Sequence, residues 1–79
     1  MTIQLHYFAL LQDQRGLAQE TLSTDAKTIA DLYAELKDRH GFTLEQTALR
    51  VSVNEQFSEW NASLNEGDEV VFIPPVSGG

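Results

Sequence analysis

The sequence predicts an α+β domain in which a mixed sheet of four to five strands packs on one main helix. Two alternating, strand-like segments precede a single long amphipathic helix, and two further strand-like segments follow it. The 79 residues show neither a repeat nor a linker, and they suffice for one hydrophobic core. Because such strands and such a helix must bury their apolar faces against each other, the pattern favours two layers.

The first strand is predicted over residues 2–7 and the second over residues 19–24, and the two should pair as a hairpin. In the first, polar and apolar residues alternate, which directs three side chains to one face: Ile3, Leu5 and Tyr7. Phe8 falls on the opposite face and is therefore a candidate contact residue, although a helical turn after it could equally bury it. Residues 13–16 are polar and end in glycine, which is typical of a loop.

The main helix is predicted to begin after Thr28, whose hydroxyl can cap the first turn, with Asp31 in the capping-box position. One apolar stripe follows at helical spacing, formed by Ile29, Leu32, Tyr33 and Leu36. Gly41 is placed to take the left-handed conformation that closes a helix.

After the helix, the sequence predicts a short helical turn over residues 43–49, a strand over residues 49–53 and a turn at residues 54–55. A second turn signal at residues 65–68 leads into residues 69–73. That last run is apolar on both faces. We therefore expect it at the centre of the sheet, with one face on the core. The other face must meet a second layer or another protein, and the small size of the chain favours a second protein.

The composition argues against several classes of function. Twelve acidic residues against five basic ones give a net charge of −7, which argues against nucleic acid as a partner and suits a solvated surface or docking on a basic protein. There is no cysteine, and hence no disulfide, thiolate metal site, iron–sulfur cluster or cysteine nucleophile. With neither a signal-peptide pattern nor an apolar run that could span a membrane, a cytoplasmic location is expected.

No group of side chains is arranged like an active site. His6 lies on the polar face of the first strand and His40 at a helix end, positions typical of surface or capping residues. The acidic residues are dispersed without metal-ligand spacing, and neither a metal nor a bound cofactor is expected. The reactive group is therefore expected to be something other than a side chain.

The chain's own α-carboxylate can be that group. A folded domain over residues 1–73 is expected to continue into a tail over residues 74–79, which consists of Pro74, Pro75, Val76, Ser77, Gly78 and Gly79. The prolines stiffen the exit from the sheet, and the glycines make a slim tether that can enter a narrow active site. After adenylation with ATP, the Gly79 carboxylate could be attacked by an amine, giving an isopeptide, or by sulfide or persulfide, giving a thiocarboxylate.

Residues 67–79 closely resemble the ending of the sulfur carrier subunits of molybdopterin synthase, the MoaD/ThiS family of β-grasp (ubiquitin-like) proteins. Weaker matches at residues 7–9 (Tyr-Phe-Ala) and residues 51–54 (Val-Ser-Val-Asn) extend the likeness over the whole chain. The resemblance implies the β-grasp fold for this sequence.

The resemblance also implies a mechanism. An E1-like enzyme would adenylate Gly79 with ATP, and a persulfide donor would convert it to a thiocarboxylate. The tail would then enter the large subunit of molybdopterin synthase, where sulfur passes to cyclic pyranopterin monophosphate in molybdenum cofactor biosynthesis. The implied assembly is a heterotetramer whose active site lies in the large subunit, so this chain would be a non-catalytic donor. Family contacts with the partner match Phe8, Phe57 and Ile73, whereas Gln12 stands where the family often has an arginine, which leaves any salt bridge of that arginine open.

Three other functions stay open. A sulfur carrier for thiamine thiazole synthesis shares the fold and the Gly-Gly end, but it is usually shorter and lacks the Pro-Pro-Val motif. A ubiquitin-like modifier would form isopeptide bonds to lysines. A plain interaction module would carry the tail incidentally.

Overall fold

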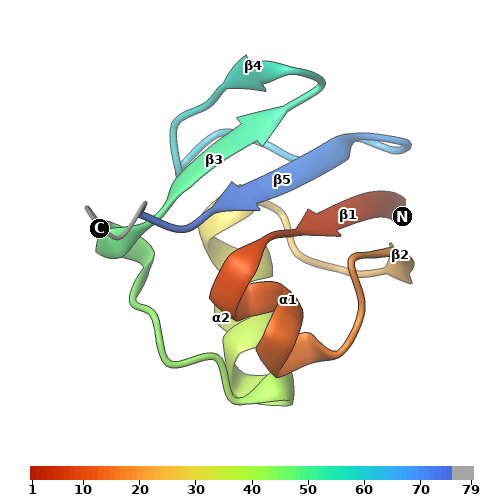
Figure 1. Cartoon of the computed structure of the whole chain (residues 1–79). Coiled ribbons are helices and arrows are strands. Elements are labelled where there is room, and N and C mark those ends of the chain that lie inside the picture. The colour runs from red at the N-terminus through yellow and green to blue at the C-terminus, as the bar shows by residue number, and fades with distance from the viewer. Residues whose placement is uncertain (76–79) are drawn as a thin grey trace.

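The computed structural model of the chain describes residues 1–75, which form a five-stranded mixed sheet with both α-helices on one side of it (Figure 1). The predicted α+β fold is therefore confirmed. In chain order the elements are β1 (Thr2–Tyr7), α1 (Ala9–Arg15), β2 (Gln19–Ser23), α2 (Ile29–His40), a 3₁₀ turn (Gln46–Ala48), β3 (Arg50–Val53), β4 (Gln56–Phe57) and β5 (Glu69–Ile73).

The sheet has the strand order β2-β1-β5-β3-β4, so β5 is central, as its apolar sequence predicts. β1 and β5 pair in parallel, and the other neighbouring strands pair antiparallel. On β5, Val70 and Phe72 are fully buried in the core. Val71 and Ile73 alternate with them and are half-buried on the other face.

A helix replaces the loop that the sequence predicts over residues 13–16. α1 continues through Arg15 and ends at Gly16, which adopts the left-handed conformation with a φ of 82°. The prediction was wrong because Leu11 alone of this short helix is buried, so that no apolar stripe marks the helix in the sequence. Tertiary contacts hold it instead, since Arg15 donates two hydrogen bonds of 2.9 Å to the Glu20 carboxylate of β2. β1 and β2 pair antiparallel as predicted, and α1 lies in the segment of the chain that connects them.

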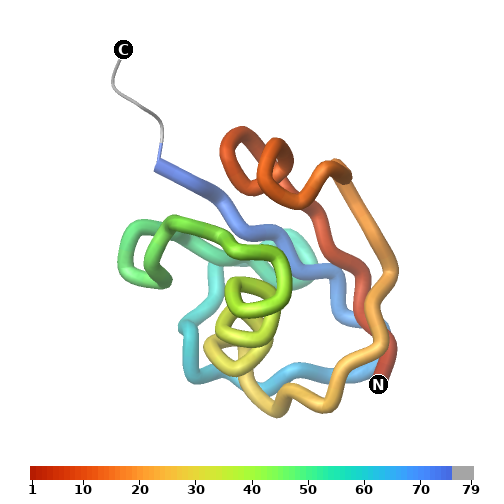
Figure 2. The backbone as a smooth tube through the Cα atoms, turned by 90° about the horizontal axis from the view of Figure 1, so that it is seen from below, coloured from red at the N-terminus to blue at the C-terminus, as the bar shows by residue number. Residues whose placement is uncertain are grey.

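The predicted start, stripe and end of the main helix are confirmed in α2. The Thr28 hydroxyl accepts a hydrogen bond of 3.1 Å from the backbone N–H of Asp31, which completes the cap. The stripe is buried beneath the sheet, which α2 crosses (Figure 2), and it consists of Ile29, Leu32, Tyr33 and Leu36. Gly41 closes the helix at a φ of 70°. Within residues 1–75, no helix is long and apolar enough to cross a membrane.

The predicted turn after β3 is confirmed, and its side chains tie β3 to the start of β5. Asn54 and Glu55 have φ values of 53° and 71° and lead into the two-residue strand β4. The Asn54 amide donates a hydrogen bond of 3.0 Å to the Asp68 carboxylate and accepts one of 3.0 Å from the backbone N–H of Glu69. Asp68 is buried, and its other oxygen accepts a bond of 2.8 Å from the backbone N–H of Asn65. These bonds fix the point at which β5 enters the sheet.

Aromatic rings fill the space between α2 and the sheet. Phe42 meets Tyr7 edge-on with ring centroids 5.8 Å apart, and Trp60 stacks on Phe72 at 6.0 Å. Tyr33 lies between these pairs, and its hydroxyl donates a hydrogen bond of 2.6 Å to a backbone carbonyl. Burial raises the pKa of Tyr33 to about 12, so it stays neutral and keeps donating at physiological pH.

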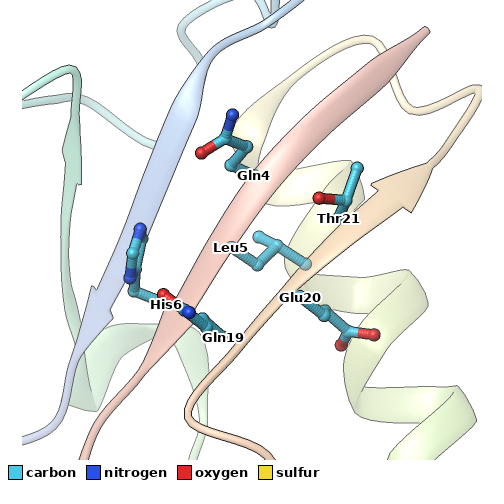
Figure 3. A pocket seen from close by; sticks show the side chains of 6 residues that line it. All are labelled: Gln4, Leu5, His6, Gln19, Glu20 and Thr21. Atoms are coloured by element: carbon cyan, nitrogen blue, oxygen red, sulfur yellow. The ribbon is translucent and has the colours of Figure 1, made fainter.

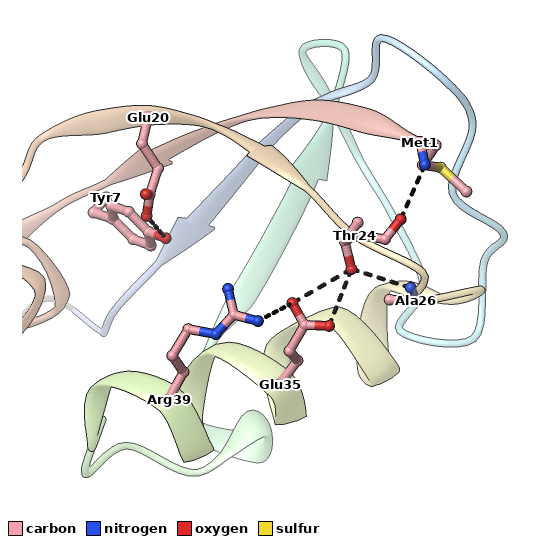
Figure 4. Close-up of polar contacts among 7 residues, drawn as sticks. All are labelled: Met1, Tyr7, Glu20, Thr24, Ala26, Glu35 and Arg39. Atoms are coloured by element: carbon pink, nitrogen blue, oxygen red, sulfur yellow. Dashed lines mark hydrogen bonds and ion pairs between the residues drawn. The ribbon is translucent and has the colours of Figure 1, made fainter.

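A polar network joins the end of β2 to α2 (Figure 4). The Thr24 hydroxyl donates a hydrogen bond of 3.2 Å to the Glu35 carboxylate, which also lies 3.6 Å from the Arg39 guanidinium. The same hydroxyl accepts a bond of 3.0 Å from the backbone N–H of Ala26, and the Met1 amino group donates to the Thr24 carbonyl at 3.1 Å. Thr24 is buried, so its polar groups need these partners.

Candidate functional site

The face of the sheet turned away from the helices is not covered by any other element of residues 1–75 (Figure 1). Strand register places a row of side chains on it, because directly paired residues project to the same side of a sheet. Across four neighbouring strands, the row consists of His6, Val71, Ser52 and Phe57. Each of these residues is half-buried or exposed, and Phe57 is 70% exposed. We call this surface the open face.

A second row lies at the end of β5 from which the tail departs. Ile73 pairs with Arg50 of β3, and Tyr7 pairs with Phe72 on the other side of β5. One residue further on, Phe8 therefore reaches the level of Ile73. Phe8 keeps an extended conformation, with φ −129° and ψ 155°, which turns it to the open face, where it is 51% exposed. The structure thus places on one face the three contact residues that the resemblance implies: Phe8, Phe57 and Ile73. Their contact with a partner stays a prediction.

The position of Phe8 depends on how α1 is attached to the sheet. The chain turns immediately after Phe8 through Ala9, whose φ of 50° lies in a region that alanine rarely adopts. The Tyr7 hydroxyl donates a hydrogen bond of 2.7 Å to the Glu20 carboxylate (Figure 4), which also receives the two bonds from Arg15. The bonded Arg15 guanidinium holds the pKa of Glu20 below its usual range, and burial raises the pKa of Tyr7. This cluster secures both ends of α1.

Arg50 belongs to the open face and was missed by the sequence reasoning, although the alternation of residues 49–53 directs it there. Its guanidinium carbon lies 5.7 Å from the centroid of the Phe57 ring. Arg50 also lines a groove of about 330 Å³ beside the start of the tail, together with Thr47, Ala48, Leu49, Ile73, Pro74 and Pro75. A cation therefore lies within the apolar part of the open face.

The open face over β1 and β2 is polar. A hollow at the β1–β2 pair is lined by Gln4, Leu5, His6, Gln19, Glu20 and Thr21 (Figure 3). By register, Leu5 and Glu20 project to the helix side, and the other four residues belong to the open face. Beside it, the His6 imidazole lies 3.5 Å from the Glu69 carboxylate. His40 is half-buried at the end of α2, where burial lowers its pKa. Among residues 1–75, no three His, Asp or Glu side chains come together as metal ligands would.

The tail starts where β5 leaves the sheet. β5 ends at Ile73, and neither Pro74, which is half-buried, nor the exposed Pro75 belongs to a strand. The other residues predicted for the tail, Val76, Ser77, Gly78 and Gly79, lie outside the described part of the chain. What the described residues supply is a surface of apolar contacts, one cation and the base of the tail.

Sequence comparison relates this chain to known proteins. Residues 5–79 match the family model described as the ThiS family. Over 98% of its length the chain is 32% identical to the "Molybdopterin synthase sulfur carrier subunit" of Escherichia coli (strain K12), of which it covers 99%. It is 30% identical over 98% of its length to the Homo sapiens protein of the same description, of which it covers 93%.

Solved structures share the fold. The crystal structure of H. volcanii small archaeal modifier protein 1 matches with a TM-score of 0.77 at 21% identity, over 95% of this chain and 98% of that one. A chain of the protein–protein complex of subunits 1 and 2 of the molybdopterin-converting factor from Helicobacter pylori 26695 matches with a TM-score of 0.69 at 21% identity, over the full length of both. These neighbours confirm the predicted β-grasp architecture.

Proposed function

Because this chain belongs to the ThiS family and is a sulfur carrier of that type, we propose that it is the sulfur carrier subunit of molybdopterin synthase. One observation carries the proposal: the match to the family model includes the tail up to Gly79. In the structure, that tail follows directly on β5, the central strand of the sheet. Three relatives that align over nearly the whole chain are each described as a molybdopterin synthase sulfur carrier subunit, which supports this choice of pathway.

Gly79 is the reacting residue in this proposal. On an E1-like enzyme its carboxylate oxygen attacks the α-phosphorus of ATP, which forms an acyl adenylate and releases pyrophosphate. The terminal sulfur of a persulfide then attacks the carbonyl carbon and displaces AMP. A thiol reduces the resulting acyl disulfide, which leaves the thiocarboxylate on Gly79. In the large subunit, this sulfur passes to cyclic pyranopterin monophosphate. ATP is a substrate of the activating enzyme, and the carrier holds no cofactor.

The open face supports docking on the large subunit. Phe8 and Phe57 are large, exposed apolar side chains, and Ile73 adjoins the tail, so a partner that covers them also receives the tail. The two-subunit complex from Helicobacter pylori supports an assembly of this kind. We propose a cytoplasmic heterotetramer in which a central dimer of large subunits binds two carriers and supplies the catalytic groups.

Intact-mass spectrometry tests the reaction. The chain is incubated with ATP, the adenylating enzyme and a persulfide donor, and we expect its mass to rise by the difference between one sulfur and one oxygen atom. A chain lacking Gly79 and a chain extended by one alanine should both stay unmodified, because the reacting carboxylate is removed or displaced. Ladders of conjugates on lysines would instead identify a modifier, and an unchanged mass would contradict both.

A deletion strain separates the two sulfur carriers. Loss of molybdoenzyme activity that is restored by this chain supports the proposal. Thiamine auxotrophy with intact molybdoenzymes would assign the chain to thiazole synthesis instead.

A further inference from the structure

Within residues 1–75, Arg50 differs from most of the basic side chains in having no acidic partner. Three of the five basic side chains form ion pairs within residues 1–75: Arg15 with Glu20, Lys37 with Glu45 and Arg39 with Glu35. In the same part of the chain, no carboxylate lies within 4.0 Å of Arg50 or of Lys27. Of these two, only Arg50 lies on the open face.

The surroundings of Arg50 prepare it for a carboxylate. Its guanidinium lies over the Phe57 ring, and such stacking leaves the N–H groups at the edge of the guanidinium plane available. Ile73, paired with Arg50 across the strands, provides an apolar wall on the other side. A guanidinium binds a carboxylate through two parallel hydrogen bonds. Arg50 is exposed in the free chain, so a partner that covers Phe57 and Ile73 would also exclude water from such a pair and strengthen it.

The negative net charge of the chain distinguishes Arg50 as a site for an acidic partner group. At a net charge of −7, most of the surface repels an acidic partner group, so Arg50 marks the place on the open face where one is favoured. Arg50 also lines the groove beside Pro74 and Pro75, which means that a contact there lies next to the base of the tail.

We propose that Arg50 is a specificity contact of the open face, which binds an Asp or Glu side chain projecting from an apolar surface of the large synthase subunit. That ion pair fixes the position in which the large subunit covers Phe57 and Ile73, and it thereby directs the tail toward the partner's active site. The inference rests on the proposed function, because it takes the large subunit as the partner.

Calorimetric titration of the large subunit from the same organism tests this contact. The parent carrier is compared with the variants Arg50→Lys, Arg50→Glu and Lys27→Glu. The last variant is the control, because it changes the net charge by the same amount as Arg50→Glu but at an exposed site away from the open face. Arg50→Glu should raise Kd at least about tenfold and Arg50→Lys by less, because Lys keeps the charge but loses the planar fork. Lys27→Glu should change Kd by less than about twofold.

The dependence on salt gives a second readout. Raising NaCl from about 0.05 M to about 0.5 M should weaken binding of the parent carrier more than that of Arg50→Glu. An unchanged Kd for Arg50→Glu, or equal effects of Arg50→Glu and Lys27→Glu, would overturn the inference. Self-association of the carrier that depends on Arg50 would assign the face to a second copy and overturn it as well. If the parent carrier itself fails to bind, the proposed function fails first, and the two failures are thereby distinguished.

Discussion

At the scale of single residues, Glu20 connects three elements near the site, because its side chain on β2 binds both β1 and α1. It accepts hydrogen bonds from the Tyr7 hydroxyl of β1 and from the Arg15 guanidinium of α1, and its side chain is only 14% exposed. Through these bonds it holds the helix that follows Phe8. Charged hydrogen bonds in a half-buried setting contribute more than an exposed ion pair does.

Glu20→Gln should lower the free energy of unfolding by about 2 kcal/mol at neutral pH, because the three charge-assisted hydrogen bonds to the carboxylate, two from Arg15 and one from Tyr7, are weakened. The pKa of Glu20 is lower in the folded state, so its stabilisation is present above the normal carboxyl range and disappears as the pH falls through the folded-state pKa. Urea unfolding at several pH values should therefore show the variant and the parent converging in acid. Glu59→Gln, at an exposed carboxylate that makes no ion pair within residues 1–75, is the control and should leave stability unchanged. A gap between variant and parent that persists in strong acid would contradict the argument.

At the scale of elements, helices and strands with a regular sequence pattern were predictable. Short elements that depend on tertiary contacts were not. α2 was predictable because its cap, stripe and closing glycine are all local signals. α1 has one buried residue and depends on Glu20, which lies outside the helix, so its second half, within residues 13–16, was predicted as a loop. β4 has only two residues, too few to show a strand pattern. The setting of Arg50 was not predictable either, because it depends on Phe57 and Ile73 of neighbouring strands.

The junction between β3 and β5 gives a test at this scale. Asp68→Ala should destabilise the fold by about 2 kcal/mol, because it removes a buried carboxylate that accepts part-buried hydrogen bonds from the Asn54 amide and the Asn65 backbone N–H. Chemical denaturation measures the loss, and hydrogen exchange at the Asn65 amide should accelerate beyond what the global change explains. Asp25→Ala, at an exposed aspartate, is the matched control. Equal stability of the two variants would show that the junction does not depend on Asp68.

At the scale of the whole molecule, the hydrophobic core and the proposed docking surface lie on opposite faces of one sheet. The core residues lie on the helix side, whereas Phe8 and Phe57 project from the other side. The strand parity of residues 69–73 was enough to predict that β5 is central and apolar on both faces. That the three predicted contact residues share one face could not be derived from parity alone, because it requires the register of β1, β5, β3 and β4.

Two phenylalanines test this separation. Phe57→Ala should weaken binding to the large subunit while leaving the melting temperature nearly unchanged, because the ring is 70% exposed. Phe42→Ala should cost about 3 kcal/mol of stability, since that ring is 3% exposed and packs against Tyr7 and Tyr33. Thermal unfolding and titration of the same samples separate the two effects. A large loss of stability in Phe57→Ala would show that the open face is part of the folding core.

The place of β5 in the sheet has a consequence for the newly made chain. β5 follows every other strand in the sequence, yet it lies between β1 and β3, so those two strands have no common neighbour until residues 69–73 have been synthesised. Pairing of segments so distant in the chain comes late in folding. A product of interrupted translation that lacks β5 therefore cannot assemble the sheet, and without the sheet it has no open face. A truncated chain would therefore lack the surface that we propose for docking, and it would not compete with complete chains for the large subunit.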